Sequence, residues 1–200
     1  TMRRIPMFMA AVLAALSTCC AAGTADPAYY IKRDTWHETM RASHEALANW
    51  LKEHDGAADK PYVSPVMRGT QPPVDIKVSV AGWNDLFLIV GDVDTYNNDV
   101  ANWGDARLIA ADGKVTYVNT LKPASVKQGW GHLALNKSAV GGALQVGSRK
   151  FAHGLGTHAI SEIHFVIGGK YQSIEACAGV DVSRGKGDGS VQFIVSRPRV

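Results

Sequence analysis

Residues 162–196, EIHFVIGGKYQSIEACAGVDVSRGKGDGSVQFIVS, contain three short apolar or alternating runs separated by glycine-rich turns. The runs span 162–167, 173–180 and 190–196. Runs of this length, bounded by Gly and Asp, are typical of β-strands that pack one face on a core. The stretch therefore predicts consecutive strands rather than helices.

Similar short apolar or alternating runs lie earlier in the chain, at 74–80, 85–90, 107–110, 115–119 and 143–146. No convincing helical pattern occurs among them, which favours an all-β sandwich or jelly roll over residues 74–200. The segment Ala111-Asp112-Gly113-Lys114 predicts a hairpin with a type I′ turn, because Asp-Gly accepts the positive φ angles of that turn.

The first 23 residues are not expected to belong to the fold. Arg3 and Arg4 precede an apolar run at 5–16, and small residues follow as far as Gly23, which is the layout of a secretory signal peptide. The apolar run is shorter than the about 20 residues that a membrane-spanning helix needs. Residues 1–23 therefore predict export.

The sequence is compatible with two ways of processing this signal peptide. Cleavage near Gly23 would release a soluble protein, whereas the segment 16–19 resembles a lipobox that would place a lipid on Cys19. The expected location is accordingly periplasmic, secreted or on the cell surface.

Residues 24–73 predict a helical element and a linker. Trp36, Met40, Leu47 and Leu51 recur at helical spacing within 34–54. A single amphipathic helix does not bury its apolar stripe alone, so it is expected to dock on the following domain or on another partner. Prolines and glycines then mark 55–73 as a linker or a wrapping segment.

Composition excludes several classes of protein. The charged fraction is 20% and the net charge is only +3, with Lys and Arg scattered, so nucleic acid is not an expected partner. Cys177 is the only cysteine after the signal segment, which excludes a disulfide scaffold and a cysteine-based zinc site. Its apolar surroundings predict a buried, inert thiol.

A set of motifs gives the sequence a family resemblance. The motifs are DVANWGDARL (99–108), QGWG (128–131), FAHGLGTHAISEI (151–163), AGVD (178–181) and GSVQFIV (189–195). Together they resemble the novel carbohydrate-binding module family, a galactose-binding-like β-sandwich, over about 74–195. The segment 85–108 precedes GLGTHA here, whereas the family usually has it last, so the order looks circularly permuted.

The resemblance implies a non-catalytic module that binds galactose-containing or related glycans and targets a linked enzyme. Its expected partners are a glycan and a neighbouring catalytic domain, and such modules often accompany secreted glycoside hydrolases. Two alternatives stay open. The sandwich could brace a catalytic domain without binding sugar, or the chain could be a fragment of a secreted glycoside hydrolase.

Aromatic and histidine residues supply the candidate sugar site. Indole rings stack on the C–H faces of sugars, and Trp130 lies between glycines that would keep it accessible, so it is the first candidate. Trp103 is a second candidate, with packing at the sandwich edge as its alternative. The remaining candidates are His153, His158 and Glu162. Strand alternation predicts that His158 and Glu162 share one face, while Ile163 and Phe165 point inward.

A loop at 91–100 is rich in Asp and Asn and therefore in hard oxygen ligands. Galactose-binding-like sandwiches frequently hold one structural calcium, so the resemblance implies calcium here, with Asp94, Asp99 and Asn102 as ligands. The alternative is a turn-rich loop in which the Asp and Asn side chains cap their own backbone.

Catalysis has little support. The segment His37-Glu38-Thr39-Met40-Arg41 differs from the HExxH zinc motif, because arginine stands at the second ligand position. The serines at 183 and 190 lie in no GxSxG elbow. The chain as given is therefore predicted not to be an enzyme.

Overall fold

The computed structural model describes residues 61–93, 98–183 and 189–197, which belong to one compact unit. The predicted signal peptide at 1–23 and the predicted helix at 34–54 lie outside these ranges. Within them the structure is built of strands and one short 3-10 helix, η2 (Val118–Thr120), so the predicted all-β class is confirmed. Among the described residues, no helix has the length and apolar character needed to cross a membrane.

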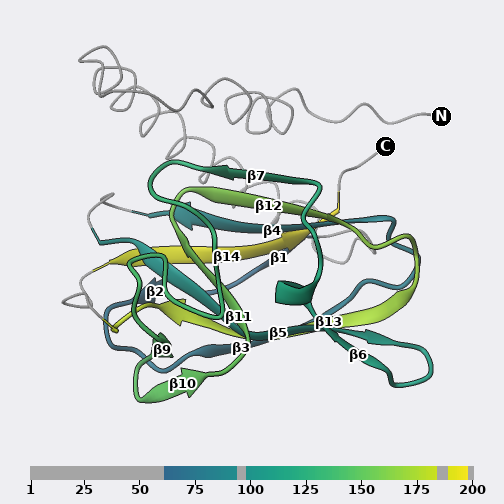
Figure 1. The fold of residues 1–200 in the computed structure, drawn as a ribbon, viewed down its shortest axis with the longest axis horizontal. Coiled ribbons are helices and arrows are strands. Elements are labelled where there is room, and N and C mark those ends of the chain that lie inside the picture. The colour runs from purple at the N-terminus through teal and green to yellow at the C-terminus, as the bar shows by residue number, and fades with distance from the viewer. Residues whose placement is uncertain (1–60, 94–97, 184–188, 198–200) are drawn as a thin grey trace, which may run out of the picture. The chain divides into compact units, whose positions relative to one another are not determined.

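The first sheet contains six strands, in the order β1-β14-β4-β12-β7 with β2 beside β14, and every pair is antiparallel (Figure 1). The strands are β1 (Tyr62–Val63), β2 (Met67–Arg68), β4 (Asp85–Asp92), β7 (Ser125–Gln128), β12 (Ser161–Val166) and β14 (Ser190–Ser196).

The second sheet also contains six strands, in the order β3-β13-β5-β11-β8 with β6 beside β5. They are β3 (Val74–Ser79), β5 (Val100–Ala110), β6 (Val115–Tyr117), β8 (Ala134–Leu135), β11 (Gly154–His158) and β13 (Tyr171–Val180). A separate hairpin of β9 (Leu144–Val146) and β10 (Arg149–Phe151) lies beside this sheet (Figure 1).

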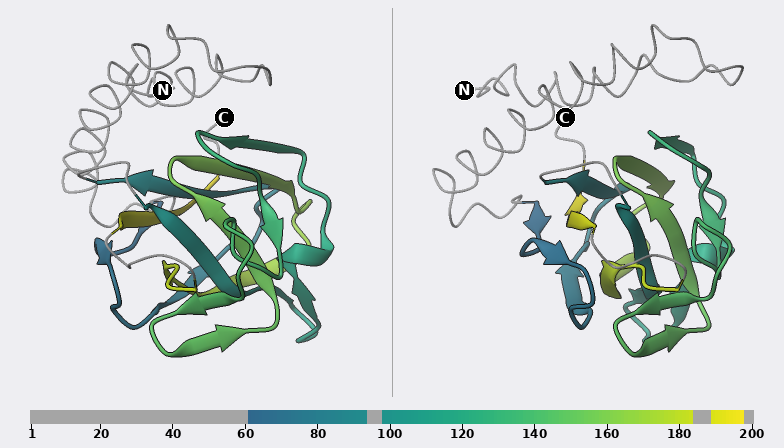
Figure 2. Two further views of the ribbon diagram at one scale, coloured as in Figure 1. Left: turned by 60° about the vertical axis from the view of Figure 1, so that its left-hand side comes forward. Right: turned by 90° about the vertical axis from the view of Figure 1, so that its left-hand side faces the viewer.

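The core lies between the two sheets, which Figure 2 shows as two layers from two directions. Leu86, Leu88 and Val90 alternate along β4 and point into the same cluster as Ile163 and Phe165 of β12. The predicted inward orientation of Ile163 and Phe165 is thus confirmed. The second sheet supplies the facing half of this core, mainly from β5 and β13, which makes the domain a β-sandwich.

Strands from the two halves of the chain are interleaved. In the second sheet β5 lies between β13 and β11, and in the first sheet β4 lies between β14 and β12. The first half therefore donates central strands to both sheets, and neither half could close a core by itself.

The β-structure begins earlier than residue 74. The segment predicted to be a linker contributes β1 and β2, which pair with β14 at the edge of the first sheet. Prolines at 61 and 65 flank β1. Proline cannot donate a ladder hydrogen bond and is tolerated at sheet edges, so a proline-rich segment can still carry short edge strands.

The turn at 111–114 differs from the predicted type I′ form. Gly113 has a φ of 82°, but Asp112 has no positive φ, and a type I′ turn requires two such residues. The Gly113 amide donates to the Ala110 carbonyl at 3.0 Å, and the Ala110 amide donates to the Lys114 carbonyl at 2.9 Å. This is a three-residue hairpin loop with its glycine in the left-handed position.

Candidate functional site

Trp130 lies in the loop that follows β7 and exposes 54% of its surface. It is one of four exposed large hydrophobic residues in the described part of the chain, and the other three, Val115, Leu135 and Val166, are aliphatic. Gly129 and Gly131 flank it, and Gly131 has a φ of 69°, a conformation that side chains rarely adopt. The predicted accessibility of Trp130 is thus confirmed.

Three hydrogen bonds hold this loop. The Gln128 Nε2 amide donates to the carbonyl oxygen of Trp130 at 2.7 Å. The Thr157 hydroxyl donates to Gln128 Oε1, also at 2.7 Å. The Gly129 amide donates to the Ile160 carbonyl at 2.9 Å. The exposed indole is therefore carried by a loop tied to β11 and to the segment that joins β11 to β12.

His158 is the ring neighbour of Trp130. The two ring centroids are 5.1 Å apart with an interplanar angle of 51°. His158 ends β11 and is only 9% exposed, and its Nδ1 lies 2.6 Å from the Ala159 carbonyl oxygen. A carbonyl only accepts, so Nδ1 carries the proton in this contact. Trp130 and His158 are the pair of predicted site residues that the fold brings together.

Trp103 was predicted to contact sugar, and this is wrong. It is 0% exposed, belongs to the central core, and packs edge-on against Phe193 with ring centroids 4.9 Å apart. Its position in β5, the strand that lies between β13 and β11, turns the indole toward the first sheet. The alternative given for this residue, packing within the sandwich, is what the structure has.

The prediction that Glu162 shares a strand face with His158 is wrong. The strand is not continuous through this region, because β11 ends at His158 in the second sheet and β12 begins at Ser161 in the first. Glu162 is 1% exposed, and its Oε1 lies 3.1 Å from Lys127 Nζ on the neighbouring β7. A carboxylate enclosed in this way and paired with lysine cannot contact a ligand beside Trp130.

His153 lies at the opposite end of β11 from His158. Five residue-to-residue steps along the extended strand separate them, a distance of roughly 16 Å. His153 stacks instead on Tyr117, with ring centroids 4.1 Å apart. A single sugar ring on Trp130 therefore cannot touch both histidines, and His153 leaves the candidate site.

The two described members of the predicted calcium site do not converge. Asp99 Oδ1 accepts the Ser190 backbone amide at 2.7 Å, beside the first sheet. Asn102 turns the other way, and its Nδ2 donates to Asp181 Oδ2 and to the Gln145 carbonyl. Among the described residues, no three His, Cys, Asp or Glu side chains are grouped as a metal site.

The third proposed ligand, Asp94, lies outside the described residues. Asp99 bonds to the backbone of Ser190, 91 positions away in the sequence, and not to the backbone of its own loop, as the alternative interpretation expected. Calcium binding by this loop stays a prediction.

The glycines of the GLGTH motif have packing roles. A Cβ on Gly156 would lie 2.2 Å from the Lys137 carbonyl oxygen and 2.7 Å from the Ala139 amide nitrogen. A Cβ on Gly154, whose φ is 137°, would lie 2.1 Å from the Trp103 carbonyl oxygen. These glycines let the backbone of neighbouring segments approach β11, and they thereby fix the strand that carries Thr157 and His158.

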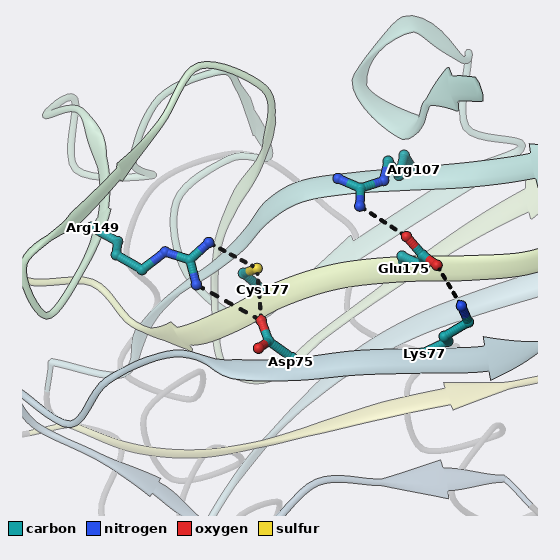
Figure 3. Close-up of polar contacts among 6 residues, drawn as sticks. All are labelled: Asp75, Lys77, Arg107, Arg149, Glu175 and Cys177. Atoms are coloured by element: carbon teal, nitrogen blue, oxygen red, sulfur yellow. Dashed lines mark hydrogen bonds and ion pairs between the residues drawn. The ribbon is translucent and has the colours of Figure 1, made fainter.

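The outer face of the second sheet carries a charged cluster, shown in Figure 3. Lys77 and Arg107 reach Glu175 from the strands on either side, at 3.0 and 2.8 Å. The hydrogen bonds from Lys77 and Arg107 hold the pKa of the Glu175 carboxyl below its ordinary value. The contacts form a solvated, self-paired surface, and nothing in them selects a ligand.

Cys177 belongs to the same face and is half-buried rather than buried. Its thiol donates to Asp75 Oδ1 at 3.0 Å, and Arg149 approaches the sulfur at 3.4 Å (Figure 3). Burial, followed by the hydrogen bond to Asp75, raises the pKa of the thiol. A thiol that stays protonated is a poor nucleophile, which agrees with the predicted inert role.

Gln128 and Thr157 support the site but were not predicted as its members. Both occur inside quoted motifs, QGWG and GLGTH. Their contact joins residues 29 positions apart in the sequence, so only the pairing of β12 with β7 brings them together. The only sequence signal for this supporting pair was that a polar residue, Gln128, directly precedes Gly-Trp-Gly.

The described residues form a β-sandwich that carries an exposed indole beside an imidazole. In the comparison with family models, residues 54–109 and 114–197 match the NPCBM/NEW2 domain. The chain belongs to this family, which is of the carbohydrate-binding-module type and is not a catalytic family. Neither the curated proteins nor the solved structures give a match.

Proposed function

We propose that this domain binds a glycan by stacking one sugar ring on Trp130, with His158 beside the ring. The observation that carries the proposal is the large exposed indole on a loop held by three hydrogen bonds. Such a ring offers an apolar face to the C–H side of a sugar, and the His158 imidazole lies next to it. Family membership supports carbohydrate as the ligand class.

The ligand contact is expected to involve a single ring. Among the described residues, Trp130 is the only exposed large aromatic side chain. A flat row of aromatic rings, as needed to grip several successive sugars or a crystalline polysaccharide surface, has no counterpart in the described residues. Binding should therefore be weak and reversible. By family resemblance, galactose-containing glycans are the first ligands to test.

The biological role that follows is targeting. A weak glycan contact on one domain raises the local concentration of substrate for any domain linked to it. The expected parent is an exported protein with a catalytic domain, such as a glycoside hydrolase. The permuted order of the motifs belongs to this proposal as well, and the pairing of the first strand β1 with the last strand β14 supports it.

Export is proposed from the N-terminal sequence alone, that is, from the two arginines and the apolar run that follows them. N-terminal sequencing of the mature protein tests it. A mature chain that starts near residue 24 supports release, and one that starts with a lipidated Cys19 supports anchoring. A mature chain that retains residues 1–23 would overturn export.

A glycan array followed by NMR titration of the best ligand tests the binding role. Trp130→Ala should weaken affinity at least about tenfold, which is about 1.4 kcal/mol and lies within the range of aromatic contacts. The matched control is Val166→Ala, which trims another exposed apolar side chain. Titrations with calcium and with a chelator should be run in parallel, because the calcium prediction rests on a loop that includes Asp94.

The outcomes separate the three functions. Binding that depends on Trp130 supports the module. Failure of the wild type to retain any glycan would favour a domain that braces a neighbouring catalytic unit. Turnover of a galactoside by this chain, abolished by a single carboxylate substitution, would establish a hydrolase.

A further inference from the structure

The segment that carries Trp130 has little rigidity of its own. Glycine flanks the indole on both sides, and glycine loses more conformational freedom on ordering than any other residue. A binding loop that is mobile in the free protein must be ordered at the expense of affinity. The geometry of the loop therefore depends on contacts outside it.

Two of the three hydrogen bonds that hold the loop form one polar chain. Thr157 is fully buried in β11, and its hydroxyl donates to Gln128 Oε1. The amide at the other end of the same side chain donates to the Trp130 carbonyl oxygen. Both distances are 2.7 Å, so each end of the Gln128 amide is engaged in a short hydrogen bond.

The direction of each hydrogen bond is fixed by chemistry. The Trp130 carbonyl only accepts, so the Gln128 NH₂ must face it, and the amide oxygen must then face the donating hydroxyl. Neither glutamate nor a hydrocarbon can make both contacts. Gln128 is half-buried, where an amide with both ends satisfied is well ordered.

The anchor of the chain is rigid. Thr157 pairs with Ala101 in the ladder between β11 and β5. Gly156 beside it leaves no space for even a methyl group against residues 137–139. Gln128 itself pairs with Ser161 at the start of β12. The polar chain thus connects one strand from each sheet to the loop at the corner where the chain passes between the sheets.

We infer that Gln128 and Thr157 are positioning residues, which act through one another to hold Trp130 in the orientation that receives the sugar. The inference rests on the proposed function, because it assigns to these residues the preorganisation of the same site. Neither side chain needs to touch the ligand. Their effect on affinity comes from the order of the loop before binding.

Two substitutions break the chain at different links. Gln128→Glu keeps an acceptor for Thr157 but removes the donor to Trp130. It also places a carboxylate oxygen against the Trp130 carbonyl oxygen, and two acceptors repel each other. Thr157→Val keeps the shape of the side chain but removes the hydroxyl. Each should weaken glycan affinity about tenfold, with Thr157→Ser within about twofold of the wild type. Gln172→Glu, a change at an exposed position on β13, is the control for added charge.

The double variant gives a sharper readout. If the two residues act through one chain, Gln128→Glu combined with Thr157→Val loses no more affinity than the worse single variant. Additive losses, or wild-type affinity in Gln128→Glu, would overturn the inference. If Thr157 only stabilised the fold, Thr157→Val would lower the melting temperature, and Thr157→Ser would not keep the glycan affinity near that of the wild type.

A second measurement needs no ligand. The indole N–H of Trp130, identified from its absence in Trp130→Phe, reports motion through its heteronuclear NOE. The NOE should fall in Gln128→Glu and Thr157→Val, and stay at the wild-type value in Thr157→Ser. An unchanged NOE in the first two variants would overturn the positioning role. If the wild type binds no glycan while the NOE responds, the proposed function fails and the positioning role stands.

Discussion

Substitution of Gly156 by alanine tests whether the GLGTH motif is a packing feature. The φ of Gly156 lies outside the left-handed range, so alanine brings no backbone strain. Its Cβ, however, would lie 2.2 Å from the Lys137 carbonyl oxygen, 2.7 Å from the Ala139 amide nitrogen and 2.9 Å from the Ser138 carbonyl carbon. All three are backbone atoms, which cannot rotate away as a flexible side chain can.

The cost follows from the movement that alanine would force. Ordinary contact begins near 3.4 Å, so the segment 137–139 must move by about 1 Å. That segment forms a tight turn, with the Ser138 amide bonded to the Gly142 carbonyl and the Gly141 amide bonded to the Ser138 carbonyl, both at 2.9 Å. Overpacking of a well-filled site costs about 1–3 kcal/mol, and a backbone clash places this variant near about 3 kcal/mol.

Thermal unfolding followed by circular dichroism measures this loss. At about 2–4 °C per kcal/mol for a chain of this size, the melting temperature should fall by roughly 6–12 °C. The control is Gly82→Ala, whose Cβ would meet nothing within 4 Å but whose φ is +74°. Strain alone should cost that variant about 1 kcal/mol. The packing explanation is wrong if the melting temperature of Gly156→Ala lies within about 2 °C of the wild-type value, or above that of Gly82→Ala.

Three further predictions concern titratable groups. Lys127→Met should destabilise the domain by about 1–3 kcal/mol in urea unfolding, because it leaves the Glu162 carboxylate enclosed without its cation, and a second change, Glu162→Leu, should restore most of the loss. The depressed pKa of Glu175 adds stability above pH 4.5 that is lost as the pH falls through the folded pKa; Glu175→Gln should flatten this part of the stability profile, by well under about 1 kcal/mol because the group is near the surface. The raised pKa of Cys177 predicts slow alkylation by iodoacetamide at pH 7.5 that accelerates only above pH 9.0; mass spectrometry of its peptide at pH 7.5 would contradict this if labelling matched that of free cysteine.

The strands with ordinary apolar alternation were predictable from the sequence. Residues 85–90 and 190–196 were expected as strands, and they appear in β4 and β14. They could be recognised because one face of each strand packs on the core and the other does not, so that apolar residues recur at every second position.

Two of the segments that were missed, β11 and the first half of β5, carry glycines for reasons that come from distant contacts. β11 contains Gly154 and Gly156, because other backbone segments pass close to it. The first half of β5 contains Gly104, over which the Phe151 ring lies so closely that a Cβ would be 2.5 Å from it. Local patterns assign such glycines to turns, because the segment that excludes the side chain comes from elsewhere in the chain.

The candidate site was predictable in part for the same reason. Trp130 could be identified because its glycine neighbours are adjacent in sequence. The separation of His153 from His158 follows from the course of β11, and the passage of the chain between sheets before Ser161 places Glu162 on another surface. Neither feature is encoded in spacing alone.

The pairing of β1 with β14 has a mechanical consequence. Tyr62 lies opposite Val195, so the chain enters and leaves the sandwich at neighbouring points on one edge. A force that pulls these two points apart would load the ladder one hydrogen bond at a time, as in opening a zipper, instead of shearing all the bonds together. Because β1 has only two residues, the edge should open under low tension while the interior strands remain paired.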